Sequence, residues 1–167
     1  MKIEDNFLEQ NVFDELQAIM MGDNIFWIYN STIDYPDEVN KFQFFHLFYV
    51  NCAPQSLFCE KVNPILKILD PVSLYRIKAN LLTRTPNIIE NEFHVDMGGM
   101  SKEKLKQWTT SIFYVNTNNG YTKFEDGTKV ESVANRLVSF PTNMKHLGTS
   151  CTDEKTRVVI NFNYYRK

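Results

Sequence analysis

The chain has 167 residues, of which 43% are hydrophobic and 14% aromatic, and it carries a formal net charge of -2. This length is enough to bury one sizeable core but short for two ordinary domains, so we expect one domain over residues 1–167. Eighteen basic residues against twenty acidic ones leave no overall positive field, which disfavours nucleic acid as a partner.

The cysteines and the N-terminal residues predict a cytoplasmic protein. Cys52, Cys59 and Cys151 are odd in number and lack C-x-x-C spacing, which argues against a disulfide framework and a zinc ribbon. The acidic start of the chain lacks the apolar segment of a signal peptide, and no run reaches the roughly eighteen apolar residues of a membrane helix. We therefore expect no membrane partner, and the sequence carries no signal for an oligomeric state.

Residues 1–70 are expected to form helices with accessory strands. Apolar residues recur at helical spacing over 7–20, which predicts an amphipathic helix. Aromatic and branched residues predict strands over 25–29 and 42–50. Residues 55–69 have the pattern of a second helix, kinked near Pro64.

Residues 72–165 have the pattern of a β core. Over 74–82, mostly polar residues alternate with apolar ones, as in a strand with two different faces. Turn-forming residues separate further short strands, which we predict at 93–96, 109–116, 137–140 and 157–164. Many short strands at close spacing indicate a sandwich or barrel.

His94-Val95-Asp96 is the motif that most directly indicates chemistry. On a strand, residues i and i+2 point to the same side, so His94 and Asp96 could bind one metal ion. His146 would complete a set of two histidines and one carboxylate, which leaves open positions for reactants as in non-haem Fe(II) oxygenases. A structural zinc site would use four protein ligands, and no cysteine lies near His94.

The tripeptide alone is weak evidence. With three histidines and twenty acidic residues, a His-x-acid pair arises by chance in roughly a third of such chains. His46 lies in an aromatic run and is expected in the core or an edge strand rather than on a metal. Arg157 opens an apolar strand, and inside a barrel it would need an anion, for which a carboxylate is well shaped. The alternatives for Arg157 are an internal ion pair or a surface position.

Taken in order, these residues resemble the 2-oxoglutarate and Fe(II)-dependent dioxygenases, and among them the prolyl 4-hydroxylase-like group. The resemblance implies a mainly β fold with flanking helices, namely a double-stranded β-helix of jelly-roll or cupin-like type with N-terminal helices buttressing one sheet. It extends from about Val72 to Tyr164 and rests on His94-Val95-Asp96, Phe113 to Asn116, Asn119 to Gly127, Asn135 to Phe140, His146-Leu147-Gly148 and Arg157.

The resemblance also implies cofactors and roles. Fe(II) would be held by His94, Asp96 and His146, and the far carboxylate of the cosubstrate 2-oxoglutarate by Arg157 with Tyr114. Asn80 is a further candidate for contact with the cosubstrate. The expected reaction uses O2, hydroxylates a C–H bond and releases succinate and CO2, with ascorbate in a supporting role. The alternative for Tyr114 is a purely structural place in the core.

The substrate is less closely defined. The subgroup resemblance points to a prolyl residue of a protein or peptide, with a small-molecule substrate as an alternative. A different class of function is a jelly-roll binding module without catalysis. The nucleic-acid demethylase branch is disfavoured, because Asn163 stands where that branch carries a second arginine. Residues 97–107, with Gly98-Gly99 and three lysines, are a candidate lid.

Overall fold

A computed structural model of the chain describes residues 1–33 and 41–166. Among the described residues, its helical elements are fewer than its strands. The helices are α1 (Gln10–Met20), the 3-10 helix η1 (Cys59–Val62), α2 (Asn63–Leu69) and α3 (Lys102–Leu105). The strands are β1 (Lys2–Glu4), β2 (Ile28–Asn30), β3 (Gln43–Val50), β4 (Ala53–Pro54), β5 (Ser73–Thr83), β6 (Trp108–Tyr114), β7 (Tyr121–Phe124), β8 (Lys129–Glu131), β9 (Arg136–Pro141), β10 (His146–Gly148) and β11 (Thr156–Tyr165).

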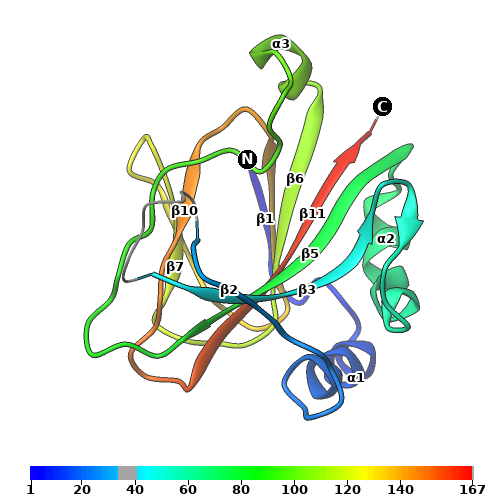
Figure 1. The fold of residues 1–167 in the computed structure, drawn as a ribbon. Helices are drawn as coiled ribbons and strands as arrows, with labels where there is room; N and C mark the ends of the chain where they lie inside the picture. Colours follow the sequence, from blue (N-terminus) through cyan, green and yellow to red (C-terminus); the bar gives the residue numbers. More distant parts are fainter. Residues whose placement is uncertain (34–40, 167) are drawn as a thin grey trace.

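The described strands form two antiparallel sheets (Figure 1). The larger has the order β1-β9-β6-β11-β5-β3-β2, with β4 paired to β3, and the smaller has the order β10-β7-β8. After β6 the chain passes to the smaller sheet for β7 and β8, returns for β9, passes again for β10, which pairs with β7, and ends in the larger sheet with β11. This is the arrangement of a double-stranded β-helix. The predicted fold class, mainly β with flanking helices, is therefore confirmed.

The larger sheet has two different faces because side chains alternate along its strands. One face meets α1 and α2, and this main core includes Phe13 and Ile65 from the helices and Ile77 from β5. The other face meets the smaller sheet, where Val138 packs with Phe124 in a second cluster. The polar alternation predicted for 74–82 is thus explained, because its polar residues face the space between the sheets.

Three predictions about local structure are wrong. The strand predicted at 25–29 is only Ile28–Asn30, and the segment 93–96 is not a regular strand but makes a single bridge from His94 to His146. Residues 55–69 do not form one kinked helix. Instead η1 leads into α2, where Pro64 lies in the first turn and its missing N–H leaves no hydrogen bond unmade.

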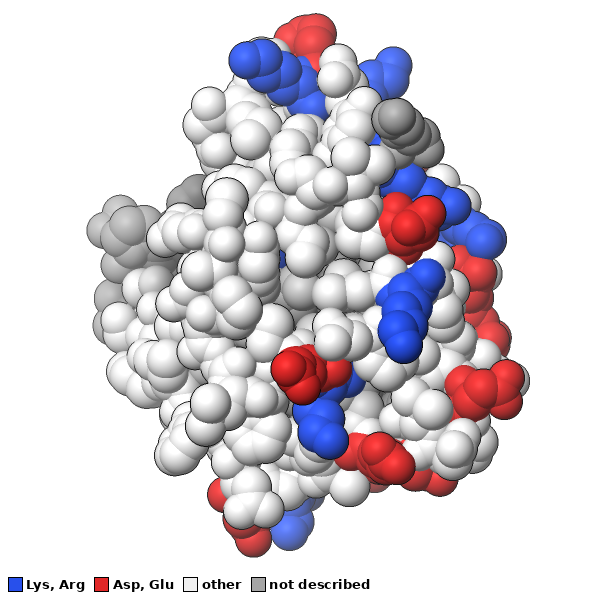
Figure 2. Space-filling model, turned by 90° about the vertical axis from the view of Figure 1, so that its right-hand side faces the viewer, with Lys and Arg blue, Asp and Glu red and all other residues white. Residues whose placement is uncertain are grey.

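His46 is a core residue, as predicted. Its ring is 6% exposed and bonds to the carbonyl oxygen of Phe26 at 2.7 Å and to Ser56 Oγ at 2.8 Å. The three cysteines are free. None of the described helices is long and apolar enough to cross a membrane. Basic and acidic side chains are interspersed on the face shown in Figure 2, around a wide uncharged area.

Candidate active site

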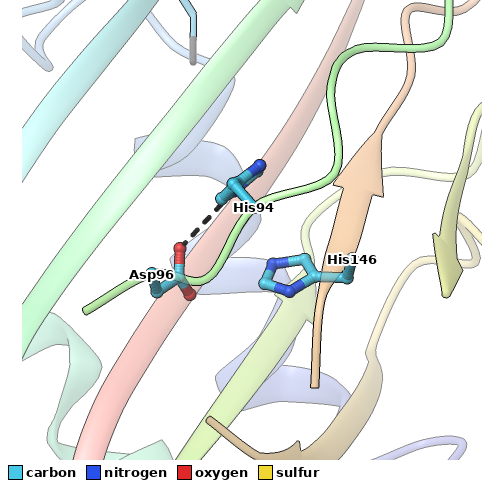
Figure 3. Close-up of side chains that lie close together, drawn as sticks. All are labelled: His94, Asp96 and His146. Carbon is cyan, nitrogen blue, oxygen red and sulfur yellow. Dashed lines mark ion pairs between the residues drawn. The ribbon is translucent and has the colours of Figure 1, made fainter. Parts of the chain in front are cut away.

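The three predicted metal ligands meet in the structure (Figure 3). One ligand atom from each of His94, Asp96 and His146 lies within 4.8 Å of the others. His146 comes from β10, whereas His94 and Asp96 come from the extended segment that precedes α3. The backbones of the two histidines exchange a pair of hydrogen bonds, each with an N···O distance of 3.0 Å. This bridge sets the separation of the two imidazoles.

Hydrogen bonds to the backbone orient both imidazole rings. Nδ1 of His94 lies 3.0 Å from the carbonyl oxygen of Glu92, and Nδ1 of His146 lies 3.4 Å from that of Met144. A carbonyl oxygen only accepts, so each Nδ1 carries a proton and it is Nε2 of each ring that is oriented to bind a metal. Phe140 packs edge-on against the His146 ring, with 4.9 Å between the ring centroids, and this contact limits rotation of the imidazole.

The Asp96 carboxylate is buried yet ionised. Its side chain is 6% exposed, and burial alone would raise the pKa. The charges of His146, Arg76 and His94, together with a hydrogen bond from Asn163, outweigh burial and hold the pKa of Asp96 below its ordinary value. The site therefore offers a carboxylate anion rather than a carboxylic acid.

A cavity of about 220 Å³ lies between the two sheets in front of these ligands. This is below the roughly 300–1,000 Å³ of pockets that enclose drug-sized ligands, so it suits a small acid. Its lining is mostly polar and includes all three metal-ligand candidates. The other polar side chains in the lining are Gln43, Arg76, Lys78, Asn80, Asn91, Thr122, Arg157 and Asn161.

Arg157 is a buried cation in the cavity wall. It is 3% exposed, and its guanidinium donates to Ser132 Oγ at 2.8 Å and to Thr122 Oγ1 at 3.2 Å. Among the described residues, no carboxylate forms an ion pair with it. Burial consequently lowers the pKa of Arg157 from its ordinary value. A buried charge with only hydroxyl partners is strongly stabilised by an incoming anion.

Tyr114 and Asn80 lie near the cavity in different ways. Asn80 lines it, and its buried Oδ1 has no hydrogen-bond partner among the described residues. Tyr114 is fully buried and is not among the described lining residues; it donates to Thr122 Oγ1 at 2.8 Å. Burial raises the pKa of Tyr114, which keeps its hydroxyl a neutral donor. Tyr114 is therefore linked to the cavity wall through Thr122, which lines it.

Thr122 was not predicted as a site residue. Its hydroxyl accepts from both Tyr114 and Arg157, so its own proton is available to a ligand in the cavity. The alternation along β7 was the available signal, because Thr122 and Phe124 share the face opposite to Tyr121 and Lys123. Asn161 and Asn163 were also missed, and both contact Asp96.

The residues present fit Fe(II) and 2-oxoglutarate. Two imidazoles and one carboxylate converge, which is the donor set of non-haem iron sites with open positions. The same cavity contains a buried arginine that lacks a carboxylate partner in the described chain. A small dicarboxylate would satisfy both ends of the cavity.

Comparison with known proteins was informative only at the level of structure. No protein-family model and no curated protein sequence matches the chain. The solved structures that are similar include a prolyl hydroxylase from Trichoplax adhaerens in complex with a hypoxia-inducible-factor peptide fragment, with a TM-score of 0.69 and 13% identity. That match covers 98% of this chain and 82% of the other. The fold is that of the 2-oxoglutarate and Fe(II) oxygenases.

Two other solved structures are similar over nearly the same length. An oxidoreductase of the 2-oxoglutarate–Fe(II) oxygenase family from Burkholderia pseudomallei has a TM-score of 0.62 and 14% identity, and the match covers 95% of this chain and 79% of that one. An alpha-ketoglutarate-dependent carbocyclase from nogalamycin biosynthesis has a TM-score of 0.61 and 12% identity, covering 98% and 78%. The likeness therefore extends over nearly the whole chain.

Proposed function

We propose that this chain is an Fe(II)- and 2-oxoglutarate-dependent dioxygenase that hydroxylates a C–H bond and releases succinate and CO2. One observation carries the proposal: three metal-ligand candidates and a buried arginine without a carboxylate partner among the described residues line the same small cavity. A binding module of the same fold needs neither an open metal site nor a buried cation. Their presence together favours catalysis.

In this proposal the chain's residues divide the work between two ends of the cavity. His94, Asp96 and His146 hold Fe(II), and Arg157 with the Thr122 hydroxyl holds the far carboxylate of 2-oxoglutarate. When bound, the iron and 2-oxoglutarate supply the activation of dioxygen. The protein orients the cosubstrate through the bidentate guanidinium and keeps water from the reacting atoms by enclosing them between two sheets.

Two further roles follow from position. Tyr114 donates a hydrogen bond to Thr122 Oγ1 and does not itself line the cavity among the described residues. We therefore assign Tyr114 to positioning Thr122 rather than to direct contact with the cosubstrate. Asn80 faces the cavity from β5, on the strand next to Arg157, and we assign it to the wall that touches the cosubstrate. Ascorbate is proposed only as the reductant that keeps iron in the Fe(II) state between turnovers.

We propose a protein or peptide substrate, with a prolyl residue as the first to test. The support is the likeness to a hydroxylase whose solved structure holds a peptide fragment. The cavity is small enough to be filled by a dicarboxylate, which would leave the substrate to approach from the His94 side, where the imidazole is 29% exposed. A small-molecule substrate is the alternative, and it would be recognised as a modified metabolite.

The decisive assay measures succinate released from 2-oxoglutarate with Fe(II) and ascorbate. We expect turnover with the wild type and none with His94→Ala or with Arg157→Met. Arg136→Met is the matched control for loss of an arginine, because Arg136 pairs with Asp5 on the surface. Absence of turnover, together with absence of 2-oxoglutarate binding to the Mn(II)-loaded protein, would refute the proposal.

The substrate is sought as a gain of one oxygen mass in a lysate incubated with active enzyme. The gain must be absent with His146→Ala. A modified peptide identifies a protein hydroxylase, and a modified metabolite with no modified peptide refutes the peptide proposal. Metal and cosubstrate binding without any turnover would identify the binding-module alternative.

A further inference from the structure

The Asp96 carboxylate is held by two asparagine side chains on β11, Asn161 and Asn163. Asn163 Nδ2 donates to Asp96 Oδ2 at 3.1 Å. Asn161 Nδ2 lies 3.3 Å from Oδ2 and 3.4 Å from Oδ1. An ionised carboxylate only accepts hydrogen bonds, so both amides must turn their nitrogen toward Asp96.

Asn163 is itself fixed in this orientation. It is fully buried, and its Nδ2 also donates to Thr110 Oγ1 at 3.1 Å. Thr110 Oγ1 in turn bonds to Thr142 Oγ1 at 3.0 Å, and both hydroxyls are buried. The register places Asn163 between Thr110 on β6 and Arg76 on β5. The hydrogen bond to Thr110 therefore fixes the amide from the β6 side.

Arg76 completes the support of Asp96 from the neighbouring strand. Its guanidinium donates to the Asp96 backbone carbonyl at 3.0 Å and lies 3.6 Å from Oδ1. The carboxylate is thus fixed at its backbone and at its side chain. The closest approach of Asp96 to His94 Nε2 is made by Oδ1, at 3.9 Å.

We infer that Asn161 and Asn163 are positioning residues whose hydrogen bonds, both to Oδ2 and a longer one from Asn161 to Oδ1, fix the Asp96 carboxylate in the orientation that faces the two imidazoles. This rests on the proposed function only in taking the metal site as real. Ligating carboxylates that are held by outer partners have little freedom to rotate, so the site keeps its ligand geometry and its affinity for the metal. The neutral amides do this without adding a further cation beside the metal.

The test measures metal affinity, independently of turnover, on variants that cannot donate. Asn163→Leu is nearly isosteric, and Asn161→Leu makes the same change at a residue in the cavity wall. Ser111→Ala is the control, because Ser111 lies beside Thr110 on β6 and its hydroxyl bonds to Ser139 and Tyr164 instead of Asp96. Mn(II) binding is followed by the EPR signal of the free ion, and folding by circular dichroism and the thermal midpoint.

We expect Asn163→Leu to weaken Mn(II) binding by about 10–100-fold, as for other partners of metal ligands. Asn161→Leu should weaken it less, because its hydrogen bonds are longer. Both should alter the Co(II) absorption spectrum, whereas Ser111→Ala should lower only the thermal midpoint. If Asn163→Leu does not fold, Asn161→Leu alone decides.

Two outcomes overturn the inference, and they differ. Folded Asn161→Leu and Asn163→Leu proteins that bind Mn(II) within about twofold of wild type, with an unchanged Co(II) spectrum, would show that the amides do not position Asp96. A wild type that binds neither ion would instead remove the metal site and the proposed function with it.

Discussion

Replacing Arg157 with methionine should separate the stability of the protein from its affinity for 2-oxoglutarate. The substitution keeps an unbranched side chain but removes the guanidinium of a residue that is 3% exposed. Among the described residues, this group hydrogen-bonds to two hydroxyls, at 2.8 and 3.2 Å, and lies over the Tyr114 ring at 5.8 Å. Losing these two hydrogen bonds costs about 1 kcal/mol each, whereas removing the desolvated charge recovers several kcal/mol. We expect the ligand-free variant to be as stable as the wild type or more stable.

The same substitution should greatly weaken the binding of 2-oxoglutarate, although it does not destabilise the ligand-free protein. A bidentate arginine–carboxylate contact supplies two charge-assisted hydrogen bonds of about 1.5–3 kcal/mol each, so its loss should raise Kd by about two to four orders of magnitude. At a concentration of 2-oxoglutarate near 100 times the wild-type Kd, binding adds about 2.7 kcal/mol to the free energy of unfolding. For a chain of this length that corresponds to a rise of roughly 5–11 °C in the thermal midpoint.

The assay is a thermal melt of the Mn(II)-loaded protein with and without 2-oxoglutarate. We expect the rise to fall below about 2 °C in Arg157→Met and to persist in Arg136→Met. A variant that loses several kcal/mol of stability while keeping the rise would refute the reasoning, because Arg157 would then be a structural ion-pair residue.

Three further predictions concern the frame around the site. Gly120→Ala should destabilise the protein by about 1–3 kcal/mol and weaken 2-oxoglutarate binding, because a Cβ at this position would lie 2.7 Å from Cδ of Arg157. The free energy of unfolding is measured in urea. Gly98→Ala is the control, because a Cβ at Gly98 would have nothing within 4 Å. The folded-state pKa of Asp96 is lowered, so its ionisation stabilises the metal-free protein at pH values above the ordinary pKa of 3.8. This contribution to stability is lost as the pH falls through the lower folded-state pKa. The difference in free energy of unfolding between wild type and Asp96→Asn, measured in urea from pH 7 to pH 3, should therefore become smaller only at the acid end. A difference that grows at the acid end would contradict this prediction. His46→Phe should cost about 1–3 kcal/mol, because it removes two partly buried hydrogen bonds, to the Phe26 carbonyl and to Ser56 Oγ. Mn(II) affinity should be unchanged, and a fall in affinity would argue against a purely structural place for His46.

The sequence was sufficient for the parts of the molecule that repeat a pattern over many residues. The helix within 7–20 and the strand over 74–82 are long enough for their periods to be recognised, and both are present as α1 and β5. Strands β7, β8 and β10 have only three or four residues each, too few to show a period of two. They form because neighbouring strands offer hydrogen bonds, which is information held in the tertiary structure.

The metal ligands could be proposed from spacing, but their supports could not. His94, Asp96 and His146 stand out because histidine is rare in this chain. Asn161 and Asn163 are ordinary polar residues in an apolar strand until the register places them under Asp96. Thr122 acquires its role in the same way, from the pairing of β7 with β10. Chemical type can be read along the chain, whereas hydrogen-bond partnership depends on the folded register.

The paired backbone hydrogen bonds between His94 and His146 link the metal site to local unfolding. The segment carrying His94 is joined to the smaller sheet by isolated bridges, at Glu90 with Thr149 and at His94 with His146, rather than by a continuous ladder. Such a segment is expected to open at a lower free energy than the strands beside it. An ion bound to both imidazoles would hold the His94 segment against the smaller sheet. Amide hydrogen exchange in this segment would therefore slow on metal loading, whereas the exchange rates of the larger sheet would not change.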